Sequence, residues 1–196
     1  MVTQMSIENR FRAEFAKAFA RNEHETVGDG RVYMPKQRCY IGGVIGYRIN
    51  EGNLNIANNV ATFEGLNDLL AVYFTAGAQR AAFYFAPYSN NVAPDQTLTA
   101  ANFTATMGEF TNYTESTRPV WTPGTVASQS VDNSAAAARC TIGTGGGTIR
   151  GAALVSNQAK SATTGVCFAC APFDTAAVLT AGSKLDLEYV LTAQDA

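Results

Sequence analysis

The first periodic pattern in the chain is an apolar stripe close to the N-terminus. Four apolar side chains recur at intervals of four residues: Ile7, Phe11, Phe15 and Phe19. This spacing places them on one face of an α-helix, with charged residues on the other faces. We therefore predict an N-terminal amphipathic helix. Its phenylalanine face packs against either the sheet of its own chain or a neighbouring subunit, and the sequence leaves both alternatives open.

A polar segment separates this helix from the rest of the chain. Residues 22–36 hold two glycines and a proline, a composition typical of a linker. We therefore divide the chain into residues 1–36, an N-terminal helix and linker that form a docking arm, and residues 37–196, the main domain.

Short β-type segments dominate the main domain. The strand candidates are residues 38–49, 80–88, 118–121, 136–142, 148–156, 164–171 and 184–192, and residues 103–110 fit a short strand or a helical turn. In the last candidate Leu185 and Leu187 alternate with Asp186 and Glu188, which predicts a core face and a face toward solvent or a partner. Turn-forming residues separate these segments. The pattern predicts a mainly β fold, an antiparallel β-sandwich of the Ig-like or jelly-roll-like kind.

One further helix is predicted at about residues 63–75. Thr62 suits the N-cap position, and Gly77 suits the end of the helix. The predicted apolar face consists of Leu66, Leu69, Leu70 and Tyr73.

Composition adds information about the surface of the protein. Charged residues make up 15% of the chain and hydrophobic residues 46%, whereas typical globular proteins hold roughly 25% charged residues. A charge-poor surface indicates that partners cover much of it, and the alternative is a monomer with a Ser/Thr/Asn surface. The net charge of -2, without a basic face, predicts no direct nucleic-acid partner.

Two further absences bear on location. The sequence lacks a run of about 18 apolar residues, so we expect no membrane partner. It also lacks a secretory signal pattern at its start, so we expect synthesis in a reducing cytoplasm and reduced cysteines.

Few residues suggest catalytic or metal chemistry. The lone histidine, His24, lies between two glutamates, so the chain cannot form a multi-histidine metal centre. Cys167 and Cys170 have CxxC spacing but fall inside a predicted strand, where positions three apart point to opposite faces. We expect buried structural thiols there. We predict no enzyme activity, no catalytic residues and no cofactor or metal.

Scattered motifs in residues 63–88 and 113–196 form a recognisable set. They are residues 64–70 (EGLNDLL), 83–85, 112–114, 118–119 with Trp121, 131–134, 149–152, 154–156 with Lys160, and 164–165. This set resembles a family of small virion proteins of tailed bacteriophages, which are described as decoration-like components. The chain departs from the family pattern in residues 83–87, which replace a Trp-containing strand, and in its N-terminal phenylalanine helix.

The resemblance implies a structural component of a tailed-phage virion, made in the bacterial host cytoplasm. We expect a capsid-decorating or cement protein, or a head–tail (neck or collar) accessory protein, that forms a homo-oligomer and binds major capsid, neck or tail proteins. The predicted docking face is Ile7, Phe11, Phe15 and Phe19. The alternative is a tail-associated host-recognition or carbohydrate-binding module. That function requires exposed aromatic side chains, for which Tyr88, Tyr113 and Trp121 are the candidates.

Overall fold

The computed structural model describes residues 25–26, 32–33 and 39–195, so the predicted docking face at residues 7–19 lies outside it. Two short strands, β1 (Glu25–Thr26) and β2 (Val32–Tyr33), pair antiparallel within the first compact unit of the chain. The second compact unit comprises residues 41–194 and holds the main body of the protein.

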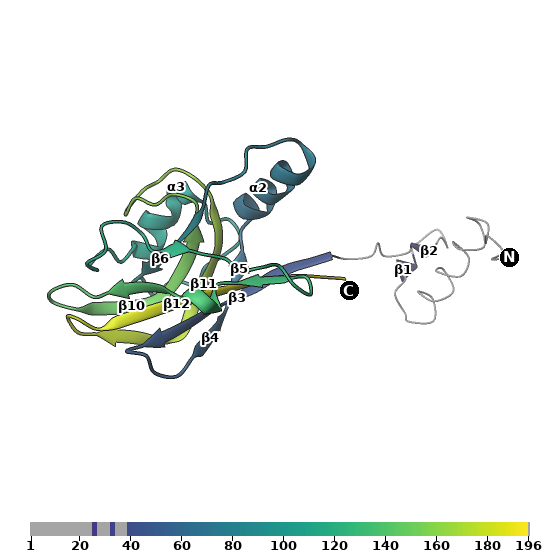
Figure 1. Cartoon of the computed structure of the whole chain (residues 1–196). Coiled ribbons are helices and arrows are strands. Elements are labelled where there is room, and N and C mark those ends of the chain that lie inside the picture. The colour runs from purple at the N-terminus through teal and green to yellow at the C-terminus, as the bar shows by residue number, and fades with distance from the viewer. Residues whose placement is uncertain (1–24, 27–31, 34–38, 196) are drawn as a thin grey trace. The chain divides into compact units, whose positions relative to one another are not determined.

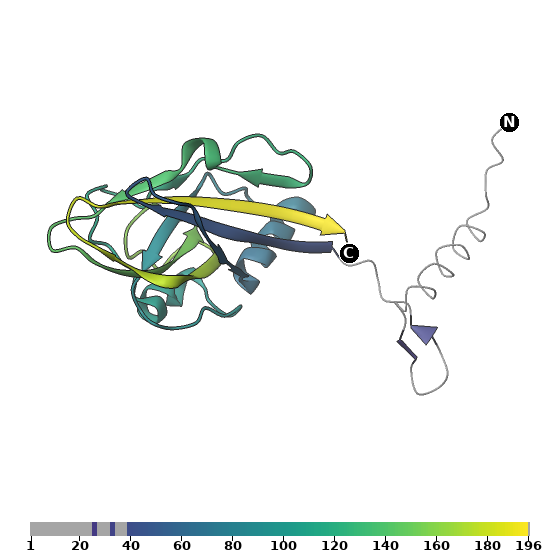
Figure 2. The same cartoon turned by 90° about the horizontal axis from the view of Figure 1, so that it is seen from below.

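Two five-stranded sheets form this main body (Figure 1). The strands of the first sheet, in spatial order, are β5 (Val60–Ala61), β11 (Cys167–Leu179), β10 (Gly147–Val155), β6 (Phe83–Tyr88) and β7 (Val120–Trp121). Those of the second are β4 (Asn55–Asn58), β3 (Cys39–Ile49), β12 (Lys184–Asp195) and β8 (Ser130–Asp132), and β9 (Ala138–Thr141) also pairs with β12. Figures 1 and 2 show β3 and β12 running side by side. Mainly β structure and antiparallel pairing are therefore confirmed.

The main hydrophobic core lies between the inner faces of the two sheets. The second sheet contributes Ile45, Tyr47, Leu185, Leu187 and Tyr189, and the first contributes Phe85, Ile149, Leu154 and Phe173. Full burial of one such side chain contributes about 1.5–3 kcal/mol. The predicted alternation in the last strand is confirmed on its core side, because Leu185 and Leu187 are fully buried. This two-sheet packing is sandwich-like.

A smaller cluster covers the outer face of the first sheet. The segment after β6 forms helix α3 (Ala100–Phe103) and the π-helical turn η1 (Thr104–Gly108). Phe103 and Met107 from this segment pack on Tyr88, Cys167 and Cys170. Residues 103–108 are thus helical, which was one of the two predicted alternatives, and Glu109 forms an isolated antiparallel bridge with Tyr88.

Helix α2 (Phe63–Phe74) begins and ends close to the predicted positions. The Gly65 N–H donates to the Thr62 side-chain oxygen at 2.9 Å, which caps the first turn. Gly65 lies against β11, where a Cβ atom would come within 2.6 Å of the Phe168 Cα atom. The absence of a side chain at this position allows the helix to approach the strand backbone closely.

Strand β11 extends further toward the C-terminus than the strand predicted at residues 164–171, and its pairing with β10 is irregular. The strand continues through Pro172 to Leu179, although proline usually interrupts a ladder. The register shifts beside this proline, because Gly151 pairs with Pro172 and Ile149 pairs with Ala177. Such an irregularity tolerates a residue without an N–H, so the strand resumes beyond it.

Candidate functional site

The outer face of α2 carries apolar side chains that the body of the protein does not cover. Phe63 and Leu70 are 52% and 50% exposed, and Tyr73 and Phe74 are each 77% exposed. Positions 63, 67, 70 and 74 share one side of the helix, so these side chains and the exposed Asn67 form a continuous surface. We call this set (Phe63, Asn67, Leu70, Tyr73 and Phe74) the α2 stripe.

The α2 stripe differs from the predicted apolar face of this helix. Leu66 and Leu69 are partly buried, as expected, but Leu70 and Tyr73 are exposed. The helix has apolar residues on both sides, and only one side faces β11. Amphipathic surface helices usually confine their apolar residues to one face. The apolar residues on a second side of residues 63–74 are the sequence signal that could have identified the stripe.

Both carboxylates of α2 are engaged by groups of the same chain. Glu64 accepts hydrogen bonds from the Ala100 N–H at 2.8 Å and the Cys167 N–H at 2.7 Å. Asp68 accepts from two nitrogens of Arg80, at 2.8 Å and 2.5 Å. The helix therefore presents its apolar stripe without an uncompensated carboxylate.

A pocket of about 300 Å³ lies beside α2, between residues of the two sheets. Tyr73 and Leu69 line it from the helix, and Phe83, Trp121 and Tyr189 line it from the strands. The Trp121 indole N–H donates to the Tyr189 carbonyl at 3.3 Å, and the two rings meet edge to face. The pocket is mainly apolar and adjoins the α2 stripe at Tyr73.

The aromatic residues considered for carbohydrate binding do not form an exposed cluster. Tyr88 is fully buried and Tyr113 is 5% exposed, so the expected exposure of these two residues is wrong. Tyr88 packs edge to face on Phe103, in the layer formed by α3 and η1. Tyr113 lies under the Lys160 ammonium group, which is 3.6 Å from the centre of the ring. Only Trp121, of the three, is partly exposed.

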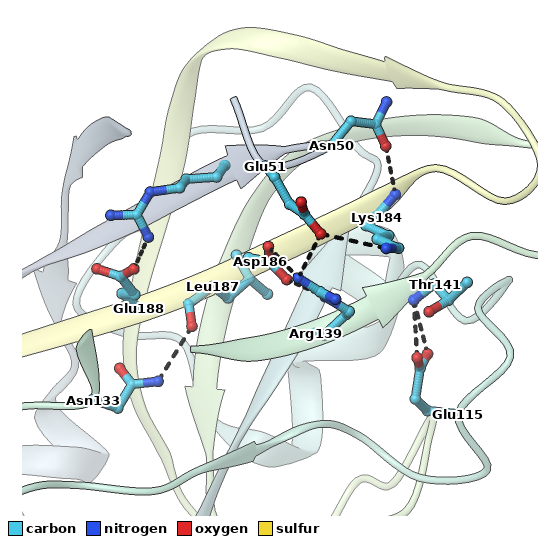
Figure 3. A network of polar contacts seen from close by, with 11 residues as sticks. Asn50, Glu51, Glu115, Asn133, Arg139, Thr141, Lys184, Asp186, Leu187 and Glu188 are labelled. Carbon is cyan, nitrogen blue, oxygen red and sulfur yellow. Dashed lines mark hydrogen bonds and ion pairs between the residues drawn. The ribbon is translucent and has the colours of Figure 1, made fainter. Parts of the chain in front are cut away.

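A network of charged side chains covers the outer face of the second sheet (Figure 3). Glu188 pairs with Arg48 from β3. Asp186 accepts from two nitrogens of Arg139 on β9, at 2.6 Å and 3.0 Å. Glu51 lies 3.5 Å from Arg139 and 3.4 Å from Lys184. Three cations and three anions thus compensate one another and connect β3, β9 and β12.

This network corrects the expectation for the carboxylates of the last strand. Asp186 and Glu188 are only 7% and 5% exposed, although they lie on the side of β12 opposite the core. Side chains from the neighbouring strands cover them, because Arg139 and Arg48 extend across the sheet surface. The two carboxylates therefore act as structural acceptors within the sheet.

A further ion pair, between Arg118 and Glu109, is fully buried. Arg118 donates to both carboxylate oxygens of Glu109, at 2.8 Å and 2.6 Å, and their side chains are 1% and 0% exposed. Arg118 also donates to the Asn157 carbonyl at 2.9 Å, and Glu109 accepts from the Ser161 N–H at 2.9 Å. Through these bonds the pair joins two loops that are distant in the sequence, residues 109–118 and residues 157–161.

The CxxC cysteines lie on one face of β11, contrary to the prediction. Both belong to the cluster under η1, because a bulge at Phe168 shifts the register: Val155 pairs with Cys167, and Leu154 with Ala169. Burial raises the pKa of the Cys167 thiol to about 12, so it is protonated at neutral pH. In the described part of the chain, no group of three or more His, Cys, Asp or Glu residues is arranged to hold a metal ion.

Taken together, these features define a mainly β protein of two packed sheets with an exposed apolar helix stripe. Comparisons with protein-family models, curated proteins and solved structures found no match for this chain. Among the residues that the structure describes, no helix has the length and apolar character needed to span a membrane.

Proposed function

We propose that this chain is a non-enzymatic structural subunit of a tailed-bacteriophage virion, built on an Ig-like or jelly-roll-like sandwich. Its role is that of a capsid-decorating or cement protein, or of a neck or collar accessory protein. The observation that supports this proposal most is the α2 stripe, an apolar helix face left uncovered on the surface of the folded body.

An exposed apolar surface of this kind marks a site of protein association. The exposed parts of these four large apolar side chains lower solubility and add nothing to the stability of the isolated chain. They become stabilising only when another surface covers them. A subunit that adds buried contacts to a particle requires such a face and does not require a reactive group.

The arrangement of charge supports the same role. The described ion pairs on the second sheet and between Arg118 and Glu109 are satisfied inside the chain. Such pairs stiffen the body and leave apolar contact as the means of association. The low content of charged residues, 15%, is consistent with this, because the cores of interfaces are depleted in charge.

The proposal is tested by the composition of purified particles. Virions from a culture that expresses this gene are isolated on a density gradient, and their proteins are quantified by mass spectrometry. We expect the chain at a fixed ratio to the major capsid protein. Its absence from particles, while it is abundant in the lysate, would refute the proposal.

The docking role of the N-terminal arm is a separate part of this proposal. Replacing Phe11 and Phe15 with serine removes two of the four apolar side chains of the predicted docking face. We expect these variants to be lost from particles while the main body remains folded. Full incorporation of the double variant would show that the arm is dispensable for docking.

A further inference from the structure

The size of the α2 stripe can be compared with what a stable interface needs. Phe63 and Leu70 are about half exposed, and Tyr73 and Phe74 about three-quarters exposed. Since large aromatic side chains each present roughly 150–250 Å², the stripe leaves roughly 500 Å² uncovered. Two such surfaces in contact bury roughly 1,000 Å², which reaches the lower limit for a specific protein interface. The stripe is therefore large enough to pair with a copy of itself.

The stripe is also free of the usual obstacle to self-association. Contact between identical surfaces brings like charges together, which is destabilising. The two carboxylates of α2 avoid this repulsion, because Glu64 binds backbone N–H groups and Asp68 binds Arg80 within the same chain. The polar member of the stripe, Asn67, carries both a donor and an acceptor, so two copies of its amide are mutually compatible.

We propose that the α2 stripe binds the same stripe of a second copy, related to the first by a two-fold axis. In such an isologous interface the same residues contribute from both chains. The inference rests on the proposed function for its biological role, since the resulting dimer is the unit that is added to the particle. The interface itself rests only on the exposure, chemistry and internal charge pairing of α2.

Introducing a charge at Asn67 tests this interface without removing any packing within one chain. Asn67→Glu and Asn67→Lys are prepared in the full-length protein, and molar mass is measured by light scattering and sedimentation. We expect a two-chain species for the unsubstituted protein. Each variant alone brings two like charges together, so its dimer should dissociate at least about tenfold more readily.

Mixing the two variants provides the decisive measurement. A glutamate variant and a lysine variant place opposite charges across the same two-fold interface, so the mixture should recover the two-chain species. The matched control is Val178→Glu, which introduces a charge at a 78% exposed valine on β11. We expect this control to remain dimeric.

Three results would overturn the proposal. They are a single-chain state of the unsubstituted protein, an assembly state that neither Asn67 variant alters, and a mixture that fails to reassociate. Circular dichroism spectra and melting temperatures confirm that the variants are folded. A chain that is present in virions but single in solution would refute the dimer alone. A stripe-dependent dimer that is absent from virions would refute the virion role alone.

Discussion

Replacing Arg118 with methionine tests whether the buried ion pair with Glu109 holds the two loops together. Both side chains are almost inaccessible to water, and the arginine also donates to the Asn157 carbonyl. Methionine has a similar length but carries neither charge nor donor. The variant therefore leaves the Glu109 carboxylate buried without its partner and removes a donor from a backbone carbonyl.

The size of the effect follows from the burial of the pair. Removing one partner of a buried salt bridge destabilises a protein by about 3–5 kcal/mol, because the remaining charge is uncompensated. For a domain of about 150–250 residues, 1 kcal/mol shifts the melting temperature by about 2–4 °C. We therefore expect the melting temperature of Arg118→Met to fall by about 6–20 °C. An exposed pair contributes only about 0–1 kcal/mol.

The assays are thermal unfolding, which gives the melting temperature, and urea unfolding, which gives the free energy of unfolding; both are followed by the fluorescence of Trp121, the single tryptophan of the chain. Arg80→Met is the matched control, because its ion pair with Asp68 is more exposed: the two side chains are 41% and 10% exposed, against 1% and 0% for Arg118 and Glu109. A second variant, Arg118→Met with Glu109→Gln, removes the unpaired charge and should recover part of the loss. If Arg118→Met destabilises the protein no more than Arg80→Met does, the buried pair does not have the role we assign to it.

The remaining predictions concern the packing of α2 on β11 and the buried thiols. Gly65→Ala should destabilise the protein by about 1–3 kcal/mol through overpacking, because the added Cβ atom would lie 2.6 Å from the Phe168 Cα atom. The control is Gly42→Ala, where nothing lies within 4 Å of the added atom. Equal melting temperatures of the two variants would contradict the reasoning. In a Cys39→Ser background, the three buried thiols should react with Ellman's reagent only after unfolding, and rapid reaction of the native protein would show that they are accessible. Burial raises the pKa of the Cys167 thiol to about 12 in the folded chain, against 9.0 for an unperturbed thiol. The folded state therefore retains a proton that the unfolded state loses between these two pH values. The free energy of unfolding should therefore fall as pH rises above about 9. Urea unfolding midpoints measured at about pH 7 and about pH 10 check this prediction. An unchanged or higher midpoint at the alkaline pH would contradict it.

Local patterns determined much of the secondary structure. Residues 63–74 form a helix because apolar residues recur on its turns and Thr62 supplies the cap. Residues 184–195 form a strand whose leucines alternate with carboxylates, and the leucines are buried as that alternation predicts. These outcomes depend on neighbours within a few positions, which is the information that a sequence pattern contains.

The tertiary structure alone decided which faces are covered. Periodicity groups residues onto a face, but it does not state which distant element will pack on that face. Asp186 became buried because Arg139 extends over it from β9. Tyr88 became buried because the segment of α3 and η1 packs over its strand.

The same limit applies to the candidate site. Leu70 and Tyr73 remain exposed because the body supplies only one surface for a helix that is apolar on both sides. The register shift at Phe168, which brings Cys167 and Cys170 to one face, depends on pairing with β10 and has no local signature. Burial and register are set by long-range contacts, so only the folded chain showed which side of α2 is left uncovered.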